Sequence, residues 1–333
     1  MRYIIYGAGA IGATMGARLF GAGHDVVMIC RGDHMRTIRS SGLTLKIPGK
    51  TFNYAIPVVE HPKAIDFQNG DVVVLTVKSQ DTELALRDLL AATGHDCPVF
   101  CAQNGVENER IAIRRFSNVH GMVVWMPATY LEPGLVLNHA TPVGGVLDCG
   151  RYPRGLDGLT SRVAKELTEA GFSALPNDNI MRWKYSKLLR NLMNAFQAVC
   201  GYDARSRKIV KALRNEALAC YKAAGIDFVS ELELRDRVQS TMKLSEIEGH
   251  PREGGSSWQS LTRGLQTVEA DYLNGEIAML GRAFNIKTPC NSLLQALANE
   301  MARHHRPAGS CTVVEIEKRF DDAANGRETT STW

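Results

Sequence analysis

Short apolar runs alternate with amphipathic stretches along the first half of the chain. Runs with the length of buried strands include RYIIY at 2–6, DVVMIC at 25–30 and DVVVLTV at 71–77. The stretches between them have apolar residues at helical spacing, for example up to Ala22 and over 81–93. Strands that alternate with helices in this way predict βαβ units, and hence a mostly parallel sheet.

This alternation continues to about residue 177, where the pattern changes. Further strands are predicted at 43–47, 51–56, 98–102 and 119–125, a hairpin within 130–148, and helices over 33–42 and 158–171. From 179 to about 304 nearly every segment has helical periodicity, including the whole of 256–280. The sequence therefore predicts three parts: an N-terminal α/β Rossmann-type doubly wound domain over 1–177, an all-α C-terminal domain over 178–315, and a polar tail over 316–333.

Composition and charge agree with two ordinary globular domains. The chain has 333 residues, 44% of them hydrophobic, which allows a sizeable core. The formal net charge is only +4, with both signs interspersed, so we expect no nucleic-acid partner. No apolar run reaches the roughly 18 residues of a membrane span, and the chain begins directly in a strand. We therefore expect a cytoplasmic protein without a membrane partner.

The cysteines predict neither disulfides nor a metal site. They are scattered among apolar neighbours without a CxxC pair, and no histidine is spaced for zinc. We expect mostly buried free thiols at Cys30, Cys97, Cys101, Cys149, Cys200, Cys220, Cys290 and Cys311.

A glycine loop follows the first strand and opens the first helix. Its sequence is GAGAIG, formed by Gly7, Ala8, Gly9, Ala10, Ile11 and Gly12. In a βαβ setting the first glycine permits a tight turn, the second lets a pyrophosphate approach, and the third allows helix and strand to pack closely. This context favours dinucleotide binding over a purely structural turn.

The end of the second predicted strand indicates which dinucleotide is bound. NAD-binding units usually carry an acidic residue there for the ribose 2′-hydroxyl, whereas this chain has Arg31. A guanidinium can bind a 2′-phosphate through two charge-assisted hydrogen bonds. We therefore predict NADP or NADPH, with a surface arginine as the alternative.

Two more loops follow strands of the predicted sheet. They carry Lys78 in TVKSQDT and Asn104 in CAQNGVE. Since ligands bind at the carboxyl edge of doubly wound sheets, we expect both side chains near the cofactor. The alternative for Asn104 and Gly105 is an ordinary turn.

The segment MRWKYSKLLRNLMNA, residues 181–195, is predicted to be a helix with an unusual polar face. Lys187, Asn191 and Asn194 stand at offsets of 0, +4 and +7, which places them within about 60° of one another on a helix. Asparagine is less favourable in helices than Lys, Glu or Gln. The face is therefore either solvated or part of a site.

Taken in order, these motifs resemble the ketopantoate reductase (2-dehydropantoate 2-reductase) family. The resemblance covers most of the chain and rests on GAGAIG at 7–12, TVKS at 76–79, QNG at 103–105, WKYSKLLRNLMNA at 183–195, SSWQSLTRGLQTVEADYLNG at 256–275 and TPCN at 288–291. It implies NADPH-dependent reduction of a 2-keto acid, foremost ketopantoate to pantoate in pantothenate biosynthesis.

The resemblance also implies roles for individual residues. Lys187 would be the general acid, and Glu269 would orient it or bind a substrate hydroxyl. The implied substrate-binding residues are Asn104, Asn191, Asn194 and Ser257. The alternatives are a helix N-cap for Ser257, an exposed helical acid for Glu269 and the catalytic role for Lys184 in place of Lys187.

The chain departs from the family pattern at three positions. Asn194 stands at +7 from the lysine instead of +8, Trp258 replaces a methionine, and Leu261 replaces an aspartate. These departures leave open a reductase of another branched or larger keto acid. A non-catalytic NADP-sensing module is the alternative from a different class. A homodimer is expected only by analogy with other helical second domains.

Overall fold

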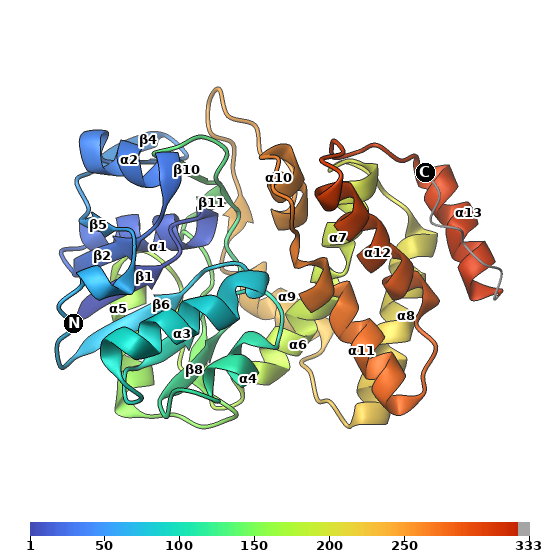
Figure 1. Ribbon diagram of the computed structural model, residues 1–333, viewed down its shortest axis with the longest axis horizontal. Helices are drawn as coiled ribbons and strands as arrows, with labels where there is room; N and C mark the ends of the chain where they lie inside the picture. The colour runs from blue at the N-terminus through green and yellow to red at the C-terminus, as the bar shows by residue number, and fades with distance from the viewer. Residues whose placement is uncertain (326–333) are drawn as a thin grey trace. The chain divides into compact units, whose positions relative to one another are not determined.

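A computed structural model of the protein describes residues 1–325 (Figure 1). The chain divides into two compact units, and each is made from two stretches of sequence. The first unit comprises Met1–Lys184 and Val229–Arg252, and the second comprises Tyr185–Phe228 and the chain from Glu253 on. Within the described residues, no helix is both long and apolar enough to span a bilayer.

The first unit is built on a seven-stranded sheet with the order β12-β8-β7-β6-β1-β2-β5. Its strands are β1 (Arg2–Tyr6), β2 (Asp25–Ile29), β5 (Val58–Val59), β6 (Asp71–Leu75), β7 (Val99–Cys101), β8 (Val119–Met122) and β12 (Cys149–Arg151). All neighbours pair in parallel except β12, which is antiparallel to β8. The order confirms the predicted doubly wound Rossmann-type sheet.

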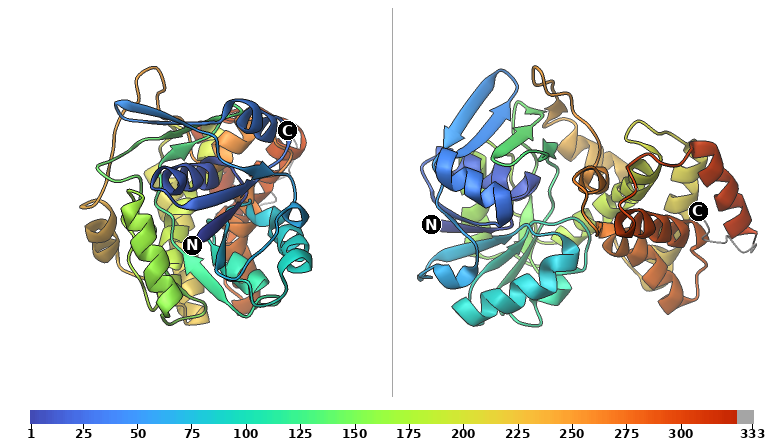
Figure 2. Two further views of the ribbon diagram at one scale, coloured as in Figure 1. Left: turned by 90° about the vertical axis from the view of Figure 1, so that its left-hand side faces the viewer. Right: turned by 45° about the horizontal axis from the view of Figure 1, so that its top comes forward.

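Helices cover both faces of this sheet, as strand alternation requires. They are α1 (Ala10–Gly21), α2 (Gly32–Ser41), α3 (Thr82–Thr93), α4 (Asn108–Ala112) and α5 (Gly158–Glu169), with 3₁₀ turns η1 (Pro62–Ala64) and η2 (Ser79–Asp81). Tyr3 and Ile5 of β1 face the core shared with α1 and α5, whereas Ile4 and Tyr6 face the core shared with α3 and α4. The left view of Figure 2 shows α5 and α3 on opposite sides of the sheet.

A second sheet in the first unit contradicts the predicted hairpin within 130–148. Its order is β4-β3-β10-β9, formed by β3 (Leu43–Ile47), β4 (Lys50–Tyr54), β9 (Ala128–Thr129) and β10 (Leu135–Asn138). β10 pairs in parallel with β3, some 90 residues earlier, while Val146 bridges Trp125 and Ser173 instead of β10. The apolar pattern identified the strand, but a local pattern does not name a distant partner.

The first unit also takes in a segment predicted to belong to the helical domain. Residues 229–252 carry α9 (Glu231–Val238) and β13 (Lys243–Leu244), which pairs with β11 (Ala140–Thr141). Arg237 of α9 donates two hydrogen bonds to the carboxylate of Asp148, at 2.5 and 2.9 Å. The predicted single boundary near 177 is therefore replaced by crossings after 184, 228 and 252.

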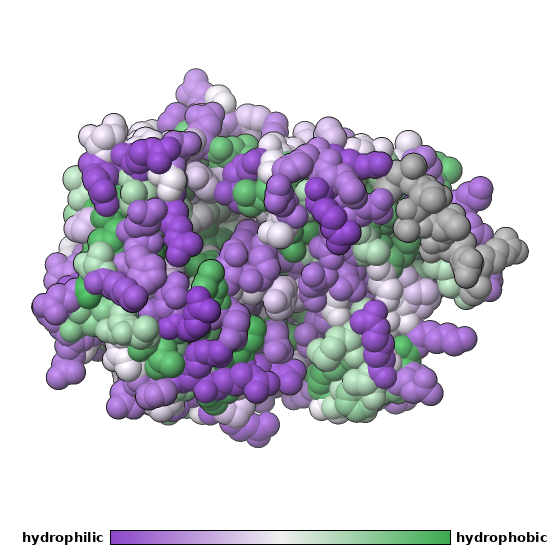
Figure 3. All heavy atoms as spheres, viewed as in Figure 1, coloured by the Kyte–Doolittle hydropathy of each residue, from purple (hydrophilic) through white to green (hydrophobic). Residues whose placement is uncertain are grey.

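The second unit is helical, as predicted. Its elements are most of α6 (Ile180–Asn191), then α7 (Met193–Cys200), α8 (Arg207–Ala224), α10 (Ser256–Thr262), the 3₁₀ turn η3 (Glu269–Tyr272), α11 (Asn274–Phe284), α12 (Pro289–Arg303) and α13 (Val313–Ala324). α7 packs against α10 and α12, and α8 packs against α11 and α12. On the face drawn in Figure 3, polar and apolar residues are interspersed.

Two stretches of the predicted helices are broken. The helical pattern over 256–280 is split into α10, η3 and α11 because Gly264 has a φ of +69° and ends α10. The amide of Leu265 then donates to the carbonyl of Ser260, the bond of a glycine-terminated helix end. The helix over 181–195 is interrupted at Leu192, so Asn194 belongs to α7.

The predicted polar tail begins too early at residue 316. α13 runs to Ala324, is capped by Thr312 and Glu315, and buries Ile316 and Phe320 on one face. Apolar residues four positions apart behind a capping box are the sequence signal for this helix. The rest of the predicted tail, 326–333, lies outside the described residues.

Candidate functional site

The glycine loop has the geometry that a bound pyrophosphate requires. Gly7 has a φ of +109°, and a side chain there would place its Cβ 2.7 Å from the amide nitrogen of Val77. A Cβ on Gly12 would lie 2.1 Å from the carbonyl oxygen of Gly7, so helix and strand pack too closely for any other residue. By contrast, a Cβ on Gly9 would meet nothing within 4 Å. The space above Gly9 is open.

The start of α1 adds main-chain amide donors beside that open space. Gly9 is the N-cap of α1 and has no side chain to bond the first-turn amides, and the first turn contains no acidic residue. The amides of Ala10, Ile11 and Gly12 belong to the turn that lacks intrahelical partners. Together with the helix dipole, they form an anion-binding end.

Arg31 lies at the carboxyl end of β2, next to this loop in the sheet. Gly7 donates its amide to the carbonyl of Ile29 at 3.0 Å, which fixes the loop against the end of β2. Arg31 is exposed and is the N-cap of α2. Asp33, two residues further on, is paired with Arg36. A guanidinium thus follows the second strand, where NAD-binding units usually carry an acidic residue.

The loops of Lys78 and Asn104 are tied to each other by buried hydrogen bonds. Gln103 donates its side-chain amide to the carbonyl of Val77 at 2.9 Å and to the hydroxyl of Thr82 at 2.7 Å. Gln103 and Thr82 are both buried. The bonds span 26 and 21 residues, so they join the β6 loop to the β7 loop.

Asn108 completes this network from the start of α4. Its side-chain NH₂ donates to the carbonyl of Asn104 at 3.0 Å and to the hydroxyl of Ser79 at 3.2 Å. Its side-chain oxygen accepts from Thr82 at 2.7 Å. Asn104 and Gly105 lie in a bend, where Gly105 has a φ of +80°, and the bond from Asn108 holds this bend in place. A fixed backbone is what a ligand-binding side chain on a loop requires.

Lys187, Asn191 and Asn194, the three residues of the predicted polar face, are half-buried, which does not fit a solvated face. Asn194 donates its side-chain amide to the hydroxyl of Ser256 at 3.3 Å, so α10 covers part of this face. The side-chain oxygen of Asn191 is buried and has no hydrogen-bond partner among the described residues. Lys187 is half-buried.

Ser257 and Glu269 are both buried, and the structure excludes a helix N-cap for Ser257 and an exposed helical acid for Glu269. Ser257 is 1% exposed and is the second residue of α10, whose N-cap is Gly255, so it is no N-cap. Its hydroxyl is buried without a hydrogen-bond partner in the described part of the chain. Glu269 is 4% exposed and begins η3, so it is no exposed helical acid. Buried polar atoms without partners are uncommon and mark candidate ligand contacts.

Lys184, the rival for the catalytic role, forms a buried ion pair. Its side chain is 2% exposed, that of Glu109 on α4 is fully buried, and the ammonium contacts the Glu109 carboxylate directly. Glu109 could not be predicted from the sequence, because it lies 75 positions from Lys184 and no motif contains it. Gln103 and Thr82 lie within the motifs QNG and TVKSQDT, but their spacing gives no sign of the bonds that join the two loops, and Asn108 lies in no motif.

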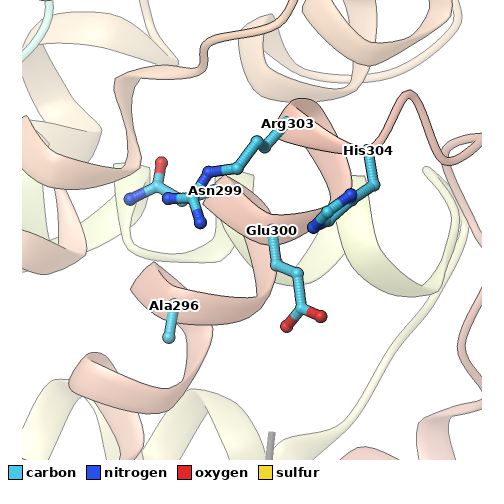
Figure 4. Close-up of a pocket in the computed structure, with 5 residues that line it drawn as sticks. All are labelled: Ala296, Asn299, Glu300, Arg303 and His304. Carbon is cyan, nitrogen blue, oxygen red and sulfur yellow. The ribbon is translucent and has the colours of Figure 1, made fainter. Parts of the chain in front are cut away.

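The described residues contain no cluster of histidine, cysteine or acidic side chains fit to hold a metal ion. All eight cysteines are free, and burial raises their thiol pKa values, for example to about 11 for Cys30. A surface depression on α12 contains none of the predicted site residues (Figure 4). It is lined by Ala296, Asn299, Glu300, Arg303 and His304.

Fold and site together define a class of protein. A doubly wound sheet with an open glycine loop at its switch point, joined to a helical unit with buried polar atoms, is the architecture of a two-domain dinucleotide-dependent oxidoreductase.

Comparison with known proteins gives the family. Residues 3–153 match the family described as ketopantoate reductase PanE/ApbA, and residues 179–302 match its C-terminal domain. The chain is 29% identical to 2-dehydropantoate 2-reductase from Pyrococcus horikoshii over 306 residues, covering 89% of this chain and 96% of that protein. It belongs to the ketopantoate reductase PanE/ApbA family and is an oxidoreductase.

Solved structures agree in fold. A PanE/ApbA family ketopantoate reductase from Ralstonia eutropha JMP134 is 28% identical, with a TM-score of 0.76 over 92% of this chain and 100% of that one. The ternary structure of D-mandelate dehydrogenase with NADH and anilino(oxo)acetate is 24% identical, with a TM-score of 0.77 over 92% of this chain and 99% of that one.

Proposed function

We propose that this protein catalyses the NADPH-dependent reduction of a 2-keto acid to a 2-hydroxy acid, with 2-dehydropantoate as the first substrate to test. The observation that carries the proposal is a pair of buried polar atoms with unused hydrogen-bonding capacity. They are the side-chain oxygen of Asn191 and the hydroxyl of Ser257, in the helical unit that also carries Lys187. The names of the curated relatives, such as the Pyrococcus horikoshii reductase, support the same reaction.

The first unit would bind the cofactor. The open loop at Gly9 and the first turn of α1 suit the pyrophosphate, and Arg31 suits a 2′-phosphate. Lys78 and Asn104 are assigned to the same cofactor because their loops follow β6 and β7 at the same edge. The bound nicotinamide supplies the hydride.

Lys187 would supply the proton. An ammonium stabilises the negative charge that develops on the carbonyl oxygen and can then donate its proton to it. Lys184 is the poorer candidate, since its ammonium is already engaged by Glu109.

The remaining polar residues would bind the substrate without competing for that proton. Asn191 and Asn194 are neutral amides that can bond the keto-acid oxygens, and Ser257 would donate to the carboxylate. Asn104 is assigned to substrate as well as to cofactor. Glu269 would orient Lys187 or accept a hydrogen bond from a substrate hydroxyl.

One observation favours a second candidate, the reduction of a bulkier keto acid. The Trp258 ring packs edge-to-face on Tyr202, with the ring centroids 5.6 Å apart, and Leu261 on the same helix is buried. These positions depart from the family pattern towards large apolar side chains. D-mandelate dehydrogenase, whose fold this chain shares, was solved with anilino(oxo)acetate.

A panel of keto acids with NADPH and with NADH tests both candidates. The panel contains ketopantoate, 2-ketoisovalerate, phenylglyoxylate and pyruvate, and kcat/KM is measured for each. A kcat/KM for ketopantoate at least tenfold above that of the other acids supports the first candidate. A kcat/KM for phenylglyoxylate that exceeds the others by the same factor supports the second. Tight NADPH binding without turnover of any keto acid would instead indicate a non-catalytic NADP-sensing module.

The cofactor assignment is tested by Arg31→Asp. This change should invert the ratio of the dissociation constants for NADPH and NADH, whereas the control Lys50→Asp on exposed β4 should not.

A further inference from the structure

One buried lysine holds both ends of the loop that carries Asn104. The ammonium of Lys184 contacts the carboxylate of Glu109 and donates to the main-chain carbonyl of Cys101 at 3.4 Å. Cys101 is the last residue of β7, and Glu109 is the second residue of α4. The loop 102–108 runs between these two contacts, with Asn104 inside it.

Lys184 and Glu109 are buried together, so removing either side chain would leave the other charge buried without its partner. Both side chains are almost fully buried, and the second carboxylate oxygen of Glu109 makes no hydrogen bond with the described residues. Burial raises the pKa of Glu109 and the Lys184 ammonium opposes that rise. In the described part of the chain, Glu107, Cys101 and Tyr152 also interact with Glu109, and none of these three is a cation.

We propose that Lys184 and Glu109 are positioning residues that hold the loop 102–108, and with it Asn104, in the geometry that the reaction needs. The inference rests on the proposed function for the role of Asn104, while the loop geometry itself is independent of it. Lys184 acts through the loop and touches neither substrate nor cofactor. The lysine that the sequence leaves as a rival acid is thereby given a different task.

The test uses the full-length protein and three variants: Lys184→Met, Glu109→Gln and the double variant. Hydrogen exchange of the peptide covering 101–109 reports the loop directly, without reference to activity. In Lys184→Met this exchange should become about tenfold faster or more, since both anchoring contacts are lost. The KM for the keto acid should rise about tenfold, and kcat/KM should fall up to about 100-fold because Asn104 is displaced. The dissociation constant for NADPH should rise only a few-fold, because the glycine loop and Arg31, which are assigned to the same cofactor, are not displaced.

The double variant separates positioning from stability. Each single change leaves a buried group without its partner, which is destabilising, whereas the double change leaves no unpaired charge. Its midpoint of thermal unfolding should therefore recover most of the loss. In the double variant, the hydrogen-exchange rate of the loop and the KM for the keto acid should stay raised, because the anchoring contacts are still missing. If a single variant does not fold, the double variant carries the test.

A matched control is available in the same unit. Arg237→Met breaks another partly buried ion pair, that of Arg237 with Asp148, and should lower the unfolding midpoint without changing exchange at 101–109. Unchanged loop exchange in both Lys184→Met and the double variant would overturn the proposal. So would loss of turnover with normal loop exchange and normal NADPH binding, which would make Lys184 the acid. If the unchanged protein reduces no keto acid, the proposed function fails, and the exchange measurements still decide the inference.

Discussion

Lys184 and Lys187 show how far the surroundings of a residue determine its role. They are the same residue type, three positions apart on α6, yet Lys184 is buried against Glu109 while Lys187 is half-buried. Spacing alone cannot separate them, because both lie near one face of the helix. The partner of Lys184 comes from another element 75 positions away.

Replacing Lys187 by alanine tests the proton-donating role at the level of one residue. We expect kcat to fall by about 10²–10⁴, as for loss of a general acid, with NADPH affinity within a few-fold of normal. Stopped-flow turnover and fluorescence titration with NADPH measure the two. Lys208→Ala removes an exposed lysine that pairs with Asp321, and should change neither. Full activity in Lys187→Ala would place the acid elsewhere.

Ser257 allows a sharper separation of stability from binding. Its buried hydroxyl has no partner among the described residues, so Ser257→Ala removes an uncompensated polar group. The free energy of unfolding should stay the same or rise by up to about 1 kcal/mol. The KM for the keto acid should rise about tenfold if the hydroxyl binds the carboxylate. Urea unfolding and steady-state kinetics on one preparation give both numbers, and a loss of stability with unchanged KM would indicate a structural hydroxyl.

At the scale of elements, the break between α6 and α7 is held by a side chain from another helix. Asn274 at the start of α11 is fully buried and donates to the carbonyl of Leu192 at 3.1 Å and to the side-chain oxygen of Asn291 at 3.1 Å. Asn291 in turn donates to Glu216 at 2.7 Å. Leu192 lies between α6 and α7, so this chain of bonds sets the direction in which α7 leaves.

Asn274→Ala should therefore affect both stability and substrate binding. Loss of buried hydrogen bonds should lower the free energy of unfolding by about 1–3 kcal/mol. The KM for the keto acid should also rise, because Asn191 and Asn194 lie on either side of the break. Asn299→Ala, which removes an exposed bond to Asp271, is the control and should leave KM unchanged. If Asn274→Ala lowers the free energy of unfolding and leaves the KM unchanged, the break does not position the side-chain amides of Asn191 and Asn194.

Elements with strong periodicity could be predicted from the sequence, and their partners could not. The strands of the parallel sheet and most helices follow from runs of apolar residues. The period over 256–280 continues through Gly264, yet the chain turns there because a left-handed glycine can end a helix without disturbing the apolar spacing. Likewise, β10 was found as a strand but assigned to a hairpin, because its pairing with β3 is non-local.

The residues of the candidate site divide in the same way. The residues in motifs, such as Gly9, Arg31 and Lys187, could be named because local spacing and the family resemblance single them out. Glu109 and Asn108 form bonds that join separate elements, and no local pattern in the sequence marks them. Burial of Ser257 and Glu269 could also not be read from a sequence in which both have ordinary surface explanations.

At the scale of the whole molecule, one carboxylate makes stability depend on pH. Asp157 accepts hydrogen bonds from the amide and hydroxyl of Thr160, both at 2.7 Å, and from Arg151 at 2.8 Å, and its second oxygen lies 3.1 Å from His120. Burial alone would raise the pKa of Asp157, but these bonds lower it well below its usual range. The carboxylate thus joins β8, β12 and the start of α5.

A lowered folded-state pKa means that the unfolded chain binds the proton first. The stabilisation from Asp157 is therefore fully present above the unfolded value of about 3.9 and is lost as the pH falls through the folded value. Asp157→Asn should be less stable at pH 7, and the difference from the unchanged protein should shrink below pH 4. Urea unfolding at pH 7, 5 and 3 measures this, and a constant difference would show that the charge does not contribute.

The discontinuity of the first unit has a consequence for synthesis on the ribosome. Residues 229–252 contribute Val229, Leu234 and Val238 to an apolar cluster with Trp125 and Trp183, and Arg237 to the pair with Asp148. The first unit therefore completes its contacts only after residue 252 has left the exit tunnel, when α7 and α8 of the other unit have already been made. Domains that fold strictly in order of synthesis avoid this delay. Until then Asp148 lacks its partner Arg237, and the apolar surface that residues 229–252 cover is exposed. The nascent first unit is therefore most accessible to chaperones and proteases while residues 185–252 are being translated.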